Sequence, residues 1–304
     1  MKALLPAEPA PRVCLAEAAE VIPRTDELLV QVEAFSLNRG ETFQLEAPRT
    51  GWRPGKDIAG RVLRPALEGS GPARGIRIVA HVDAGGWAEK AVVPLDRVAE
   101  LPDQLVSSSA AALPMAGLTA LRLLRTAGPV AGRRVLVTGA SGGVGHYLVE
   151  LAAAQGADVT VVAASPHRSA RLRALGASRA VVSVEDVEGP YDVGFDSVGG
   201  TSTGAVLRRL TTHGRLVWFG QASRRAPALD FFDWTGGTMA TISKFHYLDD
   251  PAPIADDLAA LVRLTASDRL HPEIGLHDTW DHTNEAIAAL SERRVRGNVV
   301  LDVT

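Results

Sequence analysis

A loop of closely spaced glycines between a β-like run and a helical pattern constrains this chain more than any other feature. Residues 134–165 read RVLVTGASGGVGHYLVELAAAQGADVTVVAAS. The apolar run Val135–Val137 enters the loop, and apolar residues then recur at helical spacing until Gly156 ends the pattern. A second β-branched run follows at Val159–Val162. A strand, a glycine loop, a helix and a second strand form the unit with which dinucleotide-binding folds begin.

The glycines of this loop have a physical purpose in such a unit. Glycine lets the backbone turn sharply and approach a pyrophosphate without a Cβ in between. The following helix offers free N–H groups and the positive end of its dipole to the anion. The sequence therefore predicts cofactor contacts from the whole loop: Gly139, Ala140, Ser141, Gly142, Gly143, Val144 and Gly145. A glycine turn that binds nothing is the alternative, and the complete unit argues against it.

The composition is that of an ordinary globular protein. The chain has 304 residues, 22% charged residues and a net charge of −3, which leaves room for two domains and gives no sign of a nucleic-acid partner. No apolar stretch reaches membrane-spanning length, and the N-terminal segment lacks the apolar core of a secretory signal. Cys14 is the only cysteine, which fits a reducing cytoplasm and excludes a four-cysteine zinc site.

Three stretches differ in their pattern of secondary structure. Residues 1–115 carry short β-like runs separated by turn residues, which predicts a compact β domain. The runs are Leu28–Phe35, Ala59–Leu63, Arg77–His81 and Ala88–Val93. Residues 116–249 alternate strands and helices, among them a helix over residues 201–210, which predicts a doubly wound parallel sheet. Residues 250–304 contain two helical patterns and close on a β-like run at 298–303. The expected fold class is therefore α/β, with a β-rich domain and a dinucleotide-binding domain.

Eight short motifs, taken in order along the chain, resemble those of one enzyme family. They are SLNRGE (36–41), PGKDIAGRV (54–62), GGWAEKAVVP (85–94), LPMAGLTAL (113–121), GASGGVG (139–145), FDSVGG (195–200), GRLVWFG (214–220) and RGNVVLDV (296–303). Together they resemble the zinc-independent medium-chain dehydrogenases/reductases (the MDR superfamily), in the branch of quinone oxidoreductases and enoyl reductases. The resemblance implies a GroES-like domain of residues 1–115, completed by residues 250–304, and a Rossmann domain of residues 116–249. It also implies that nicotinamide and substrate bind between these domains.

The chain departs from the metal-dependent relatives at the positions of their zinc ligands. Those relatives place a cysteine near the position of Asn38 and a histidine–glutamate pair near Lys56 and Asp57, so no metal site is predicted here. Quinone reductase relatives commonly carry a tyrosine at the position of Phe43, so a hydroxyl group near the substrate is expected to be absent.

The residues after the second strand of the unit favour NADPH over NADH. NAD-binding units place a carboxylate about 20 residues after the glycine loop, where it binds the ribose 2′-OH. Here Ser165 occupies that place and Arg168 follows, so a hydroxyl and a guanidinium would meet a 2′-phosphate. Two alternatives stay open. Ser165 and Pro166 also make a favourable helix start, and Arg168 or Arg171 could simply be solvated.

The resemblance implies further cofactor contacts around the loop. It assigns Thr119 to the phosphates, Val198 and Gly199 to the crevice beside the cofactor, and another group to the nicotinamide end. That group consists of Phe219, Gly220, Gln221, Ser243, Phe245 and, in place of the family's usual lysine, Asn298. Core packing is the alternative for the two phenylalanines.

The chemistry implied by the resemblance is hydride transfer to a quinone or an α,β-unsaturated carbonyl compound. Without a metal, hydrogen-bond donors must polarise the acceptor oxygen, and Asn38 is the candidate by family analogy. Phe43 belongs to the catalytic group by position, and Lys244 could supply the final proton. Asn38 could instead only fix its loop, and Lys244 could be an ordinary exposed lysine.

Two other protein classes were candidates on the glycine loop alone. A short-chain dehydrogenase needs Tyr-x-x-x-Lys, but no lysine follows at that distance from Tyr147, Tyr191 or Tyr247. A non-catalytic NADPH-binding scaffold of the same fold stays open, because Phe43 lacks a hydroxyl group. In either case we expect a cytoplasmic homodimer whose partner is a small molecule rather than a nucleic acid or a membrane.

Overall fold

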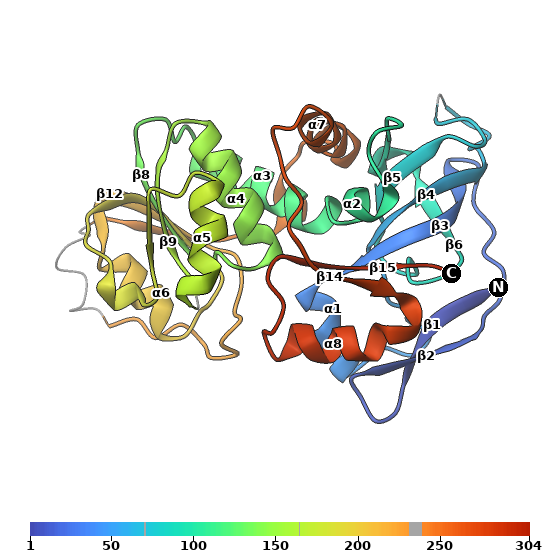
Figure 1. Ribbon diagram of the computed structural model, residues 1–304, viewed down its shortest axis with the longest axis horizontal. Coiled ribbons are helices and arrows are strands. Elements are labelled where there is room, and N and C mark those ends of the chain that lie inside the picture. The colour runs from blue at the N-terminus through green and yellow to red at the C-terminus, as the bar shows by residue number, and fades with distance from the viewer. Residues whose placement is uncertain (70, 164, 231–238) are drawn as a thin grey trace. The chain divides into compact units, whose positions relative to one another are not determined.

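The computed structural model describes residues 1–69, 71–163, 165–230 and 239–304. By its internal contacts the chain divides into two units. Unit 1 consists of Met1–Leu118 and Ala252–Thr304, and unit 2 consists of Thr119–Pro251. Each unit is built around a sheet of its own (Figure 1).

Unit 1 contains a seven-stranded mixed sheet. Its strands are β3 (Glu27–Leu37), β4 (Asp57–Arg64), β5 (Arg77–His81), β6 (Lys90–Pro94), β7 (Val98–Glu100), β14 (Ile274–Thr279) and β15 (Asn298–Asp302). The order is β14-β15-β3-β4-β5-β7, and β6 pairs with β3 beside this path. Because β15 pairs with β3 on one side and β14 on the other, it lies inside the sheet. Alternating burial along β3 places Leu28, Val30 and Val32 in the core of the unit.

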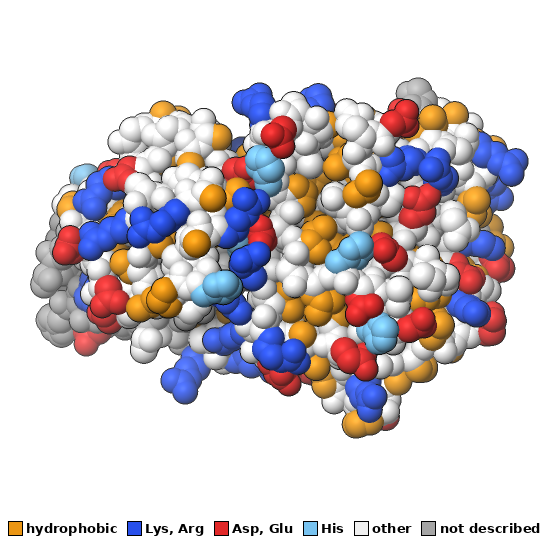
Figure 2. Space-filling model, viewed as in Figure 1, with side chains coloured by type: hydrophobic (Ala, Val, Ile, Leu, Met, Phe, Trp, Pro, Cys, Tyr) orange, Lys and Arg blue, Asp and Glu red, His pale blue; other side chains and the backbone are white. Residues whose placement is uncertain are grey.

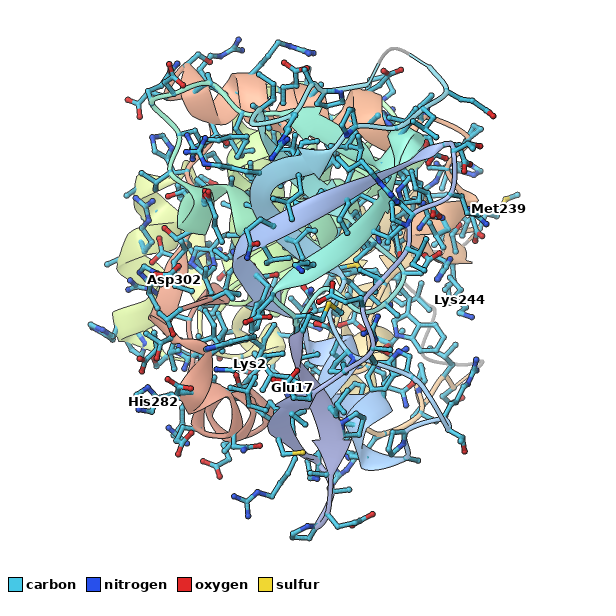
Figure 3. The ribbon with its side chains drawn as sticks, turned by 90° about the vertical axis from the view of Figure 1, so that its right-hand side faces the viewer. Lys2, Glu17, Met239, Lys244, His282 and Asp302 are labelled. Atoms are coloured by element: carbon cyan, nitrogen blue, oxygen red, sulfur yellow. The ribbon has the colours of Figure 1, made fainter. Side chains whose placement is uncertain are left out.

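Smaller elements complete unit 1. They are the hairpin strands β1 (Lys2–Ala7) and β2 (Arg12–Glu17), and the helices α1 (Arg39–Glu46), α2 (Ser107–Ala111), α7 (Ile254–Ala266) and α8 (Thr283–Ser291). The sequence patterns predicted no strand over this hairpin, because Pro6 interrupts the alternation within β1, and Pro9 and Pro11 lie in the turn between the two strands. Figure 3 shows the open end of this hairpin, where Lys2 and Glu17 are partners across the two strands.

Unit 2 contains a six-stranded sheet in which the neighbouring strands are parallel. Its strands are β8 (Arg134–Thr138), β9 (Asp158–Val162), β10 (Arg179–Val181), β11 (Tyr191–Asp196), β12 (Leu210–Trp218) and β13 (Thr241–Lys244). The order β10-β9-β8-β11-β12-β13 changes direction between β8 and β11, as it does in doubly wound dinucleotide-binding folds. The helices α4 (Gly143–Ala154), α5 (Pro166–Ala174) and α6 (Thr201–Leu207) connect strands of this sheet. The predicted α/β fold class is confirmed.

The remaining elements are one long helix and several short turns. Helix α3 (Pro114–Ala127) begins in unit 1 and continues into unit 2. Short 3₁₀ turns lie at Leu95–Arg97, Val184–Asp186, Tyr247–Asp249 and Trp280–His282. Among the helices that the structure describes, none is both long enough and apolar enough to cross a membrane.

One predicted boundary is wrong in unit 2. The sequence pattern predicted a helix over residues 201–210, but α6 ends at Leu207 and β12 begins at Leu210. The Arg209 carbonyl oxygen accepts the N–H of Tyr191 (2.7 Å), so the chain has already joined the sheet at this point.

Candidate active site

The glycine loop of unit 2 joins the end of β8 to the first turn of α4. Gly139 has a φ of +64°, and a Cβ there would lie 2.1 Å from the Ser197 hydroxyl oxygen. A Cβ on Gly145 would lie 2.4 Å from the Ala140 carbonyl oxygen, because α4 packs directly on the loop. The fold itself therefore favours glycine at position 139 and requires it at position 145, where the clash is with backbone.

Gly142 differs, because the fold does not require a glycine there. Its φ of −84° and ψ of 174° suit any residue, and a Cβ would meet only the Gly139 carbonyl oxygen, at 3.6 Å. Next to it, the Ser141 side chain is buried, and its hydroxyl has no hydrogen-bond partner among the described residues. Gly143 and Val144 follow as the first residues of α4. An open approach to the backbone and a buried hydroxyl without a partner are what a phosphate would use, so the loop fits the pyrophosphate of a dinucleotide.

A buried carboxylate fixes the segments around this loop. Asp196, at the end of β11, is fully buried and accepts a hydrogen bond from the hydroxyl of Thr138 at the end of β8 (2.5 Å). It also accepts hydrogen bonds from the hydroxyls of Ser202 (3.0 Å) and Thr203 (2.7 Å) in α6, and from the N–H of Gly199 (3.2 Å). Asp196 was not among the predicted site residues. The sequence feature that could have identified Asp196 is a carboxylate at the carboxyl end of a buried parallel strand, because sheets of this type bind ligands there.

The segments that follow β11 and β12 lie side by side. Backbone hydrogen bonds join the N–H of Ala222 to the carbonyl of Ser197 (2.9 Å), and the N–H of Ser223 to the carbonyl of Val198 (2.8 Å). A Cβ on Gly199 would lie 2.9 Å from Cγ of Gln221, which shows how closely the two segments pack. The structure therefore brings together one group of predicted cofactor residues: Val198, Gly199, Phe219, Gly220 and Gln221.

The next strand places the remaining predicted residues of unit 2 at the same edge of the sheet. Ser243 and Lys244 end β13, and the Phe245 N–H donates to the carbonyl of Trp218 at the end of β12 (2.9 Å). Phe219 and Phe245 are half-buried, so neither is a core residue. Lys244 is exposed and its side chain points outward (Figure 3), which agrees with the alternative of an ordinary surface lysine.

The residues predicted to bind a 2′-phosphate lie at the start of α5. Ser165 is the N-cap residue, but its side chain makes no capping hydrogen bond, so the helix does not use the hydroxyl. Arg168 lies in the first turn and is half-buried. The helix also carries Arg171 and Arg173 and has no acidic residue. Figure 2 shows Lys and Arg side chains gathered over the part of unit 2 that contains α5, which gives this end of the sheet the charge that a phosphate needs.

In unit 1, Asn38 belongs to a buried polar network centred on Asp57. Asn38 is the N-cap residue of α1, and its Nδ2 donates to Asp57 Oδ2 (2.7 Å). Asp57 also accepts hydrogen bonds from Ser36 Oγ (2.9 Å) and from the Met115 N–H at the start of α3 (3.1 Å), and it lies 2.9 Å from Nδ1 of His81. Ser36, Asp57 and His81 are register partners on β3, β4 and β5, which places them in a row across the sheet.

Glu41 lies beside this network and is completely buried, with 0% of its surface exposed. Its carboxyl oxygens accept the backbone N–H groups of Asn38 (2.8 Å) and Gly55 (3.0 Å), so the side chain ties α1 to the segment before β4. Burial, followed by repulsion from the Asp57 carboxylate, raises the pKa of Glu41 to about 8. Glu41 is therefore mainly protonated at neutral pH.

Two predicted catalytic residues, Asn38 at the N-cap of α1 and Phe43 within it, have few hydrogen-bond donors to offer a substrate. One amide N–H of Asn38 is bound to Asp57, and the amide nitrogen lies 3.5 Å from Oε2 of Glu41. These contacts agree with the alternative in which Asn38 fixes its loop. Phe43 is 37% exposed, with the guanidinium of Arg39 6.0 Å from the ring centre, and it has no polar group for a substrate.

The last two predicted cofactor residues belong to different units. Thr119 is a buried residue of α3 and the first residue of unit 2. Asn298 is the first residue of β15 in unit 1, where its amide donates to the carbonyl oxygen of Glu273 (3.1 Å). This internal bond occupies a donor with which Asn298 was expected to contact the cofactor.

The chain is similar in sequence to known oxidoreductases. Residues 175–301 match a family described as zinc-binding dehydrogenase, and residues 135–188 match the NAD dependent epimerase/dehydratase family. The chain is 32% identical over 201 residues to a chloroplast envelope quinone oxidoreductase homolog of Arabidopsis thaliana, covering 61% of this chain and 60% of the relative. It is 31% identical over 196 residues to the 2-methylene-furan-3-one reductase of Solanum lycopersicum (58% and 50% covered). It is 33% identical over 259 residues to polyketide synthase GfsB of Streptomyces halstedii (82% and 4% covered).

Solved structures share the fold over nearly the whole chain. A mycobacterial protein complexed with NADPH has a TM-score of 0.90 at 23% identity, covering 99% of this chain and 100% of that chain. The quinone oxidoreductase of Escherichia coli complexed with NADPH has a TM-score of 0.88 at 19% identity, covering 99% of both chains. At these identities the likeness shows the fold alone.

The chain spans 60% or less of the length of each of the three curated relatives described above. The motifs along the sequence, the matching dehydrogenase family and the shared fold nevertheless point to one group of proteins. The chain is thus similar in sequence to quinone oxidoreductases and related reductases, and it shares the fold of solved quinone oxidoreductases.

Proposed function

We propose that the protein is an NADPH-dependent oxidoreductase that delivers hydride to a quinone or an α,β-unsaturated carbonyl acceptor without zinc. The observation that carries this proposal is the glycine loop. Gly142 leaves an open approach to the backbone, and the buried Ser141 hydroxyl has no partner among the described residues. The names of the relatives, a quinone oxidoreductase homolog and a 2-methylene-furan-3-one reductase, support the same function, as does NADPH in two structural neighbours.

In unit 2 the residues of the loop hold and orient the cofactor, which supplies the hydride when bound. The segment Gly139–Gly145 and the N-terminus of α4 bind the pyrophosphate, with the Ser141 hydroxyl as an additional donor. Asp196 joins the end of β8 to the segment at Gly199, so the two walls of the site keep a constant spacing. The half-buried ring of Phe245 offers apolar surface to the nicotinamide end.

In unit 1 the acceptor oxygen needs a hydrogen-bond donor. The bond to Asp57 fixes the plane of the Asn38 amide, and the contact from this amide to Glu41, at 3.5 Å, is at the limit of a hydrogen bond. Because Glu41 is mainly protonated at neutral pH, it attracts that N–H weakly. We propose that this second N–H of Asn38 donates a hydrogen bond to the acceptor oxygen. The final proton then comes from solvent or from the exposed Lys244.

The side chains at the expected ligand positions argue for a reaction without zinc. Asn38, Lys56 and Asp57 occupy these positions, and Asp57 is already engaged by protein groups on both of its oxygens. In the described parts of the chain, no group of three His, Cys, Asp or Glu side chains is arranged to hold a metal ion. A conjugated acceptor suits such a site, because it spreads the arriving charge onto an oxygen that one or two donors stabilise. A simple alkoxide needs the stronger stabilisation that zinc gives.

The choice of acceptor tests this reaction type. We expect the protein to oxidise NADPH with quinones or enones, to leave simple secondary alcohols unchanged with NADP⁺, and to be unaffected by a chelator. The measurement is the steady-state loss of NADPH absorbance with a panel of both substrate classes, before and after treatment with EDTA. Efficient alcohol oxidation without turnover of any quinone or enone would show that the reaction type is wrong. Activity that is lost with EDTA and restored by zinc would contradict the absence of zinc.

NADPH should bind more tightly than NADH, and Arg168→Ala should reduce the difference about tenfold or more. A charge-assisted contact with a phosphate is worth about 1.5–3 kcal/mol, which sets this magnitude. Titration calorimetry with both cofactors measures it. Arg173→Ala is the matched control, because Arg173 is exposed on the same helix and its guanidinium donates to the Ser178 carbonyl, at 3.4 Å. Equal affinities for the two cofactors contradict the prediction, and an effect confined to Arg171→Ala would assign the phosphate to Arg171.

A non-catalytic NADPH-binding protein of the same fold is the second candidate. It is favoured by two observations: Phe43 has no hydroxyl group, and the Asn38 amide is bound to Asp57. This candidate requires tight binding of NADPH together with no turnover of any acceptor in the panel.

We also propose that the protein is a cytoplasmic homodimer with a small-molecule substrate. Cys14, the only cysteine, is free, which suits a reducing compartment. β13 is the last described strand of its sheet on that side, so its outer edge offers backbone groups to a second copy of the chain. Light scattering in solution measures the oligomeric state.

A further inference from the structure

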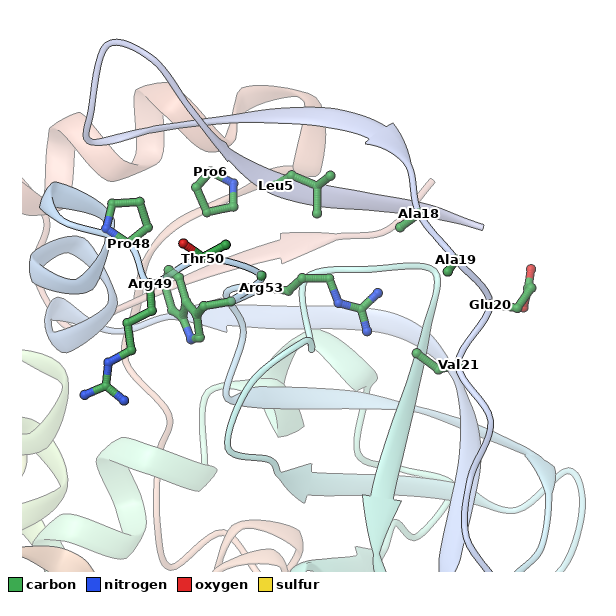
Figure 4. Close-up of a pocket in the computed structure, with 12 residues that line it drawn as sticks. Leu5, Pro6, Ala18, Ala19, Glu20, Val21, Pro48, Arg49, Thr50 and Arg53 are labelled. Carbon is green, nitrogen blue, oxygen red and sulfur yellow. The ribbon is translucent and has the colours of Figure 1, made fainter.

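A groove in unit 1 has side chains that suit an anionic ligand. It has a volume of about 660 Å³ and lies between residues 18–21, which follow β2, and residues 48–53, which follow α1 (Figure 4). Leu5 and Pro6 of β1 add an apolar wall. None of the residues assigned above to cofactor binding or hydride transfer lines this groove.

The loop at residues 48–53 holds a defined conformation. The Trp52 N–H donates to the carbonyl of Arg49 (3.0 Å), and Gly51 between them has a φ of +75°, as a tight turn requires. The carbonyl of Arg53 accepts the N–H of Gly85 (2.9 Å), which fixes the backbone at the other end of the loop. The side chains of this loop are therefore presented from a fixed backbone.

The loop carries positive charge that the protein does not neutralise. Among the described residues, neither Arg49 nor Arg53 forms an ion pair or a side-chain hydrogen bond. Glu20 also lines the groove, but Lys90 binds both of its carboxylate oxygens (2.9 and 3.2 Å) and lowers the pKa of Glu20. The guanidinium of Arg53 is thus left with an uncompensated charge beside apolar surface.

The two arginines differ in their position. Figure 4 shows the Arg53 side chain extending between the loop and the Ala18–Val21 segment, whereas Arg49 points away at the other end of the loop. Arg53 is half-buried and Arg49 is exposed. Trp52 is also half-buried and packs against the core of the unit. Arg53 is therefore placed to bind an oxyanion, and the apolar surface of Leu5, Pro6 and Trp52 is placed to bind a carbon chain.

We propose that this groove binds the anionic end of the acceptor, with a carboxylate or phosphate held by Arg53 and an apolar chain along Leu5, Pro6 and Trp52. The inference rests on the proposed function only in taking the ligand to be the acceptor. The loop connects the groove to the candidate catalytic network. It follows α1, whose N-cap is Asn38, and it leads to Gly55, which donates to Glu41. An acceptor with a remote acidic group is then preferred over an uncharged one.

Binding of a matched pair of enones to the full chain without cofactor tests the groove. The probes are 8-(3-oxocyclohex-1-enyl)octanoate, an enone with a carboxylate at the end of an alkyl chain, and its uncharged methyl ester, measured by titration calorimetry. We expect the acid to bind about tenfold more tightly at low salt, with the difference shrinking as salt is added. Arg53→Gln should abolish the difference without changing the affinity for the ester, and Arg53→Lys should keep part of it. Arg74→Gln, at an exposed arginine elsewhere in unit 1, should have no effect.

A second pair of probes identifies the kind of anion. Crotonyl-CoA carries phosphates, whereas the crotonyl thioester of N-acetylcysteamine is uncharged. If only the second pair shows a preference for the charged member that depends on Arg53, the groove binds a phosphate. If only the first pair shows such a preference, the groove binds a carboxylate. Equal binding of the charged and uncharged member in both pairs, or an Arg53→Gln variant that keeps the preference, overturns the proposal. Because binding is measured without NADPH, a failure to turn over any acceptor counts against the proposed function and not against the groove.

Discussion

The stability of the folded protein should fall as the pH rises from about 4.5 to about 8, and Glu41→Gln should remove this part of the pH dependence. Glu41 is completely buried, and its pKa is raised from the ordinary 4.5 to about 8. Below pH 4.5 the group is protonated in both the folded and the unfolded chain, and its contribution to stability is fully present. Between the two values the unfolded chain releases a proton that the folded chain keeps, so the free energy of unfolding falls. A shift of this size corresponds to at most about 5 kcal/mol.

Urea unfolding of the wild type and Glu41→Gln at several pH values between 4.5 and 8.5 measures this effect. Glutamine is uncharged throughout, so the stability of the wild type relative to the variant should drop by roughly 3–5 kcal/mol over this range. Glu68→Gln, at an exposed glutamate of unit 1, should follow the wild type at every pH. Parallel curves for the wild type and Glu41→Gln would mean that Glu41 is ionised in the folded protein across the whole range.

The second large effect is expected at the glycine loop, where Gly142→Val should lower the affinity for NADPH by about a hundredfold or more while the protein stays folded. A Cβ at this position meets only the Gly139 carbonyl oxygen at 3.6 Å, so the fold accepts a side chain there. The added methyl groups would fill the space through which a pyrophosphate approaches the loop. Losing one or two charge-assisted hydrogen bonds, each worth about 1.5–3 kcal/mol, gives the expected magnitude.

Titration calorimetry and thermal unfolding of the same preparation separate loss of binding from loss of fold. Gly145→Val is the contrasting variant, because its Cβ would lie 2.4 Å from the Ala140 carbonyl oxygen. We expect Gly145→Val to unfold at a much lower temperature, and Gly142→Val to unfold within a few degrees of the wild type. Normal NADPH binding by Gly142→Val would show that the loop is only a turn.

The sheet of unit 2 could be predicted from the sequence because its signals are local. The run Val135–Val137, the loop Gly139–Gly145 and the helix after it follow one another within a single stretch of chain, and the parallel strand order follows from repeating this pattern. The hairpin of β1 and β2 carries no such signal. Pro6 breaks the alternation of β1, although a proline is tolerated in a strand that lies at an edge.

The polar network of unit 1 could not be predicted, because its members meet only after the strands pair. Ser36 and Asp57 are 21 residues apart and Asp57 and His81 are 24 residues apart, and the register of β3, β4 and β5 brings them together. The sequence alone allowed two roles for Asn38: a hydrogen-bond donor to the acceptor oxygen, or a residue that fixes its own loop. The contacts of Asn38 with Asp57 and Glu41 show that it has the second role at least.

The position of β15 inside the sheet of unit 1 has a consequence for the order in which a ribosome lets this protein fold. β3 leaves the ribosome early, but its partner β15 is made only after all of unit 2. During synthesis, unit 2 has every described strand of its sheet before unit 1 does. β3 can pair with β6 over Glu27–Gln31, but the Ala34–Leu37 part of that edge stays unpaired until β15 is made. An open β edge invites pairing with another chain, so a growing or truncated polypeptide is more prone to aggregate than the finished one. Newly made chains of this protein should therefore depend on chaperones until β15 has been made, and not only until unit 2 has folded.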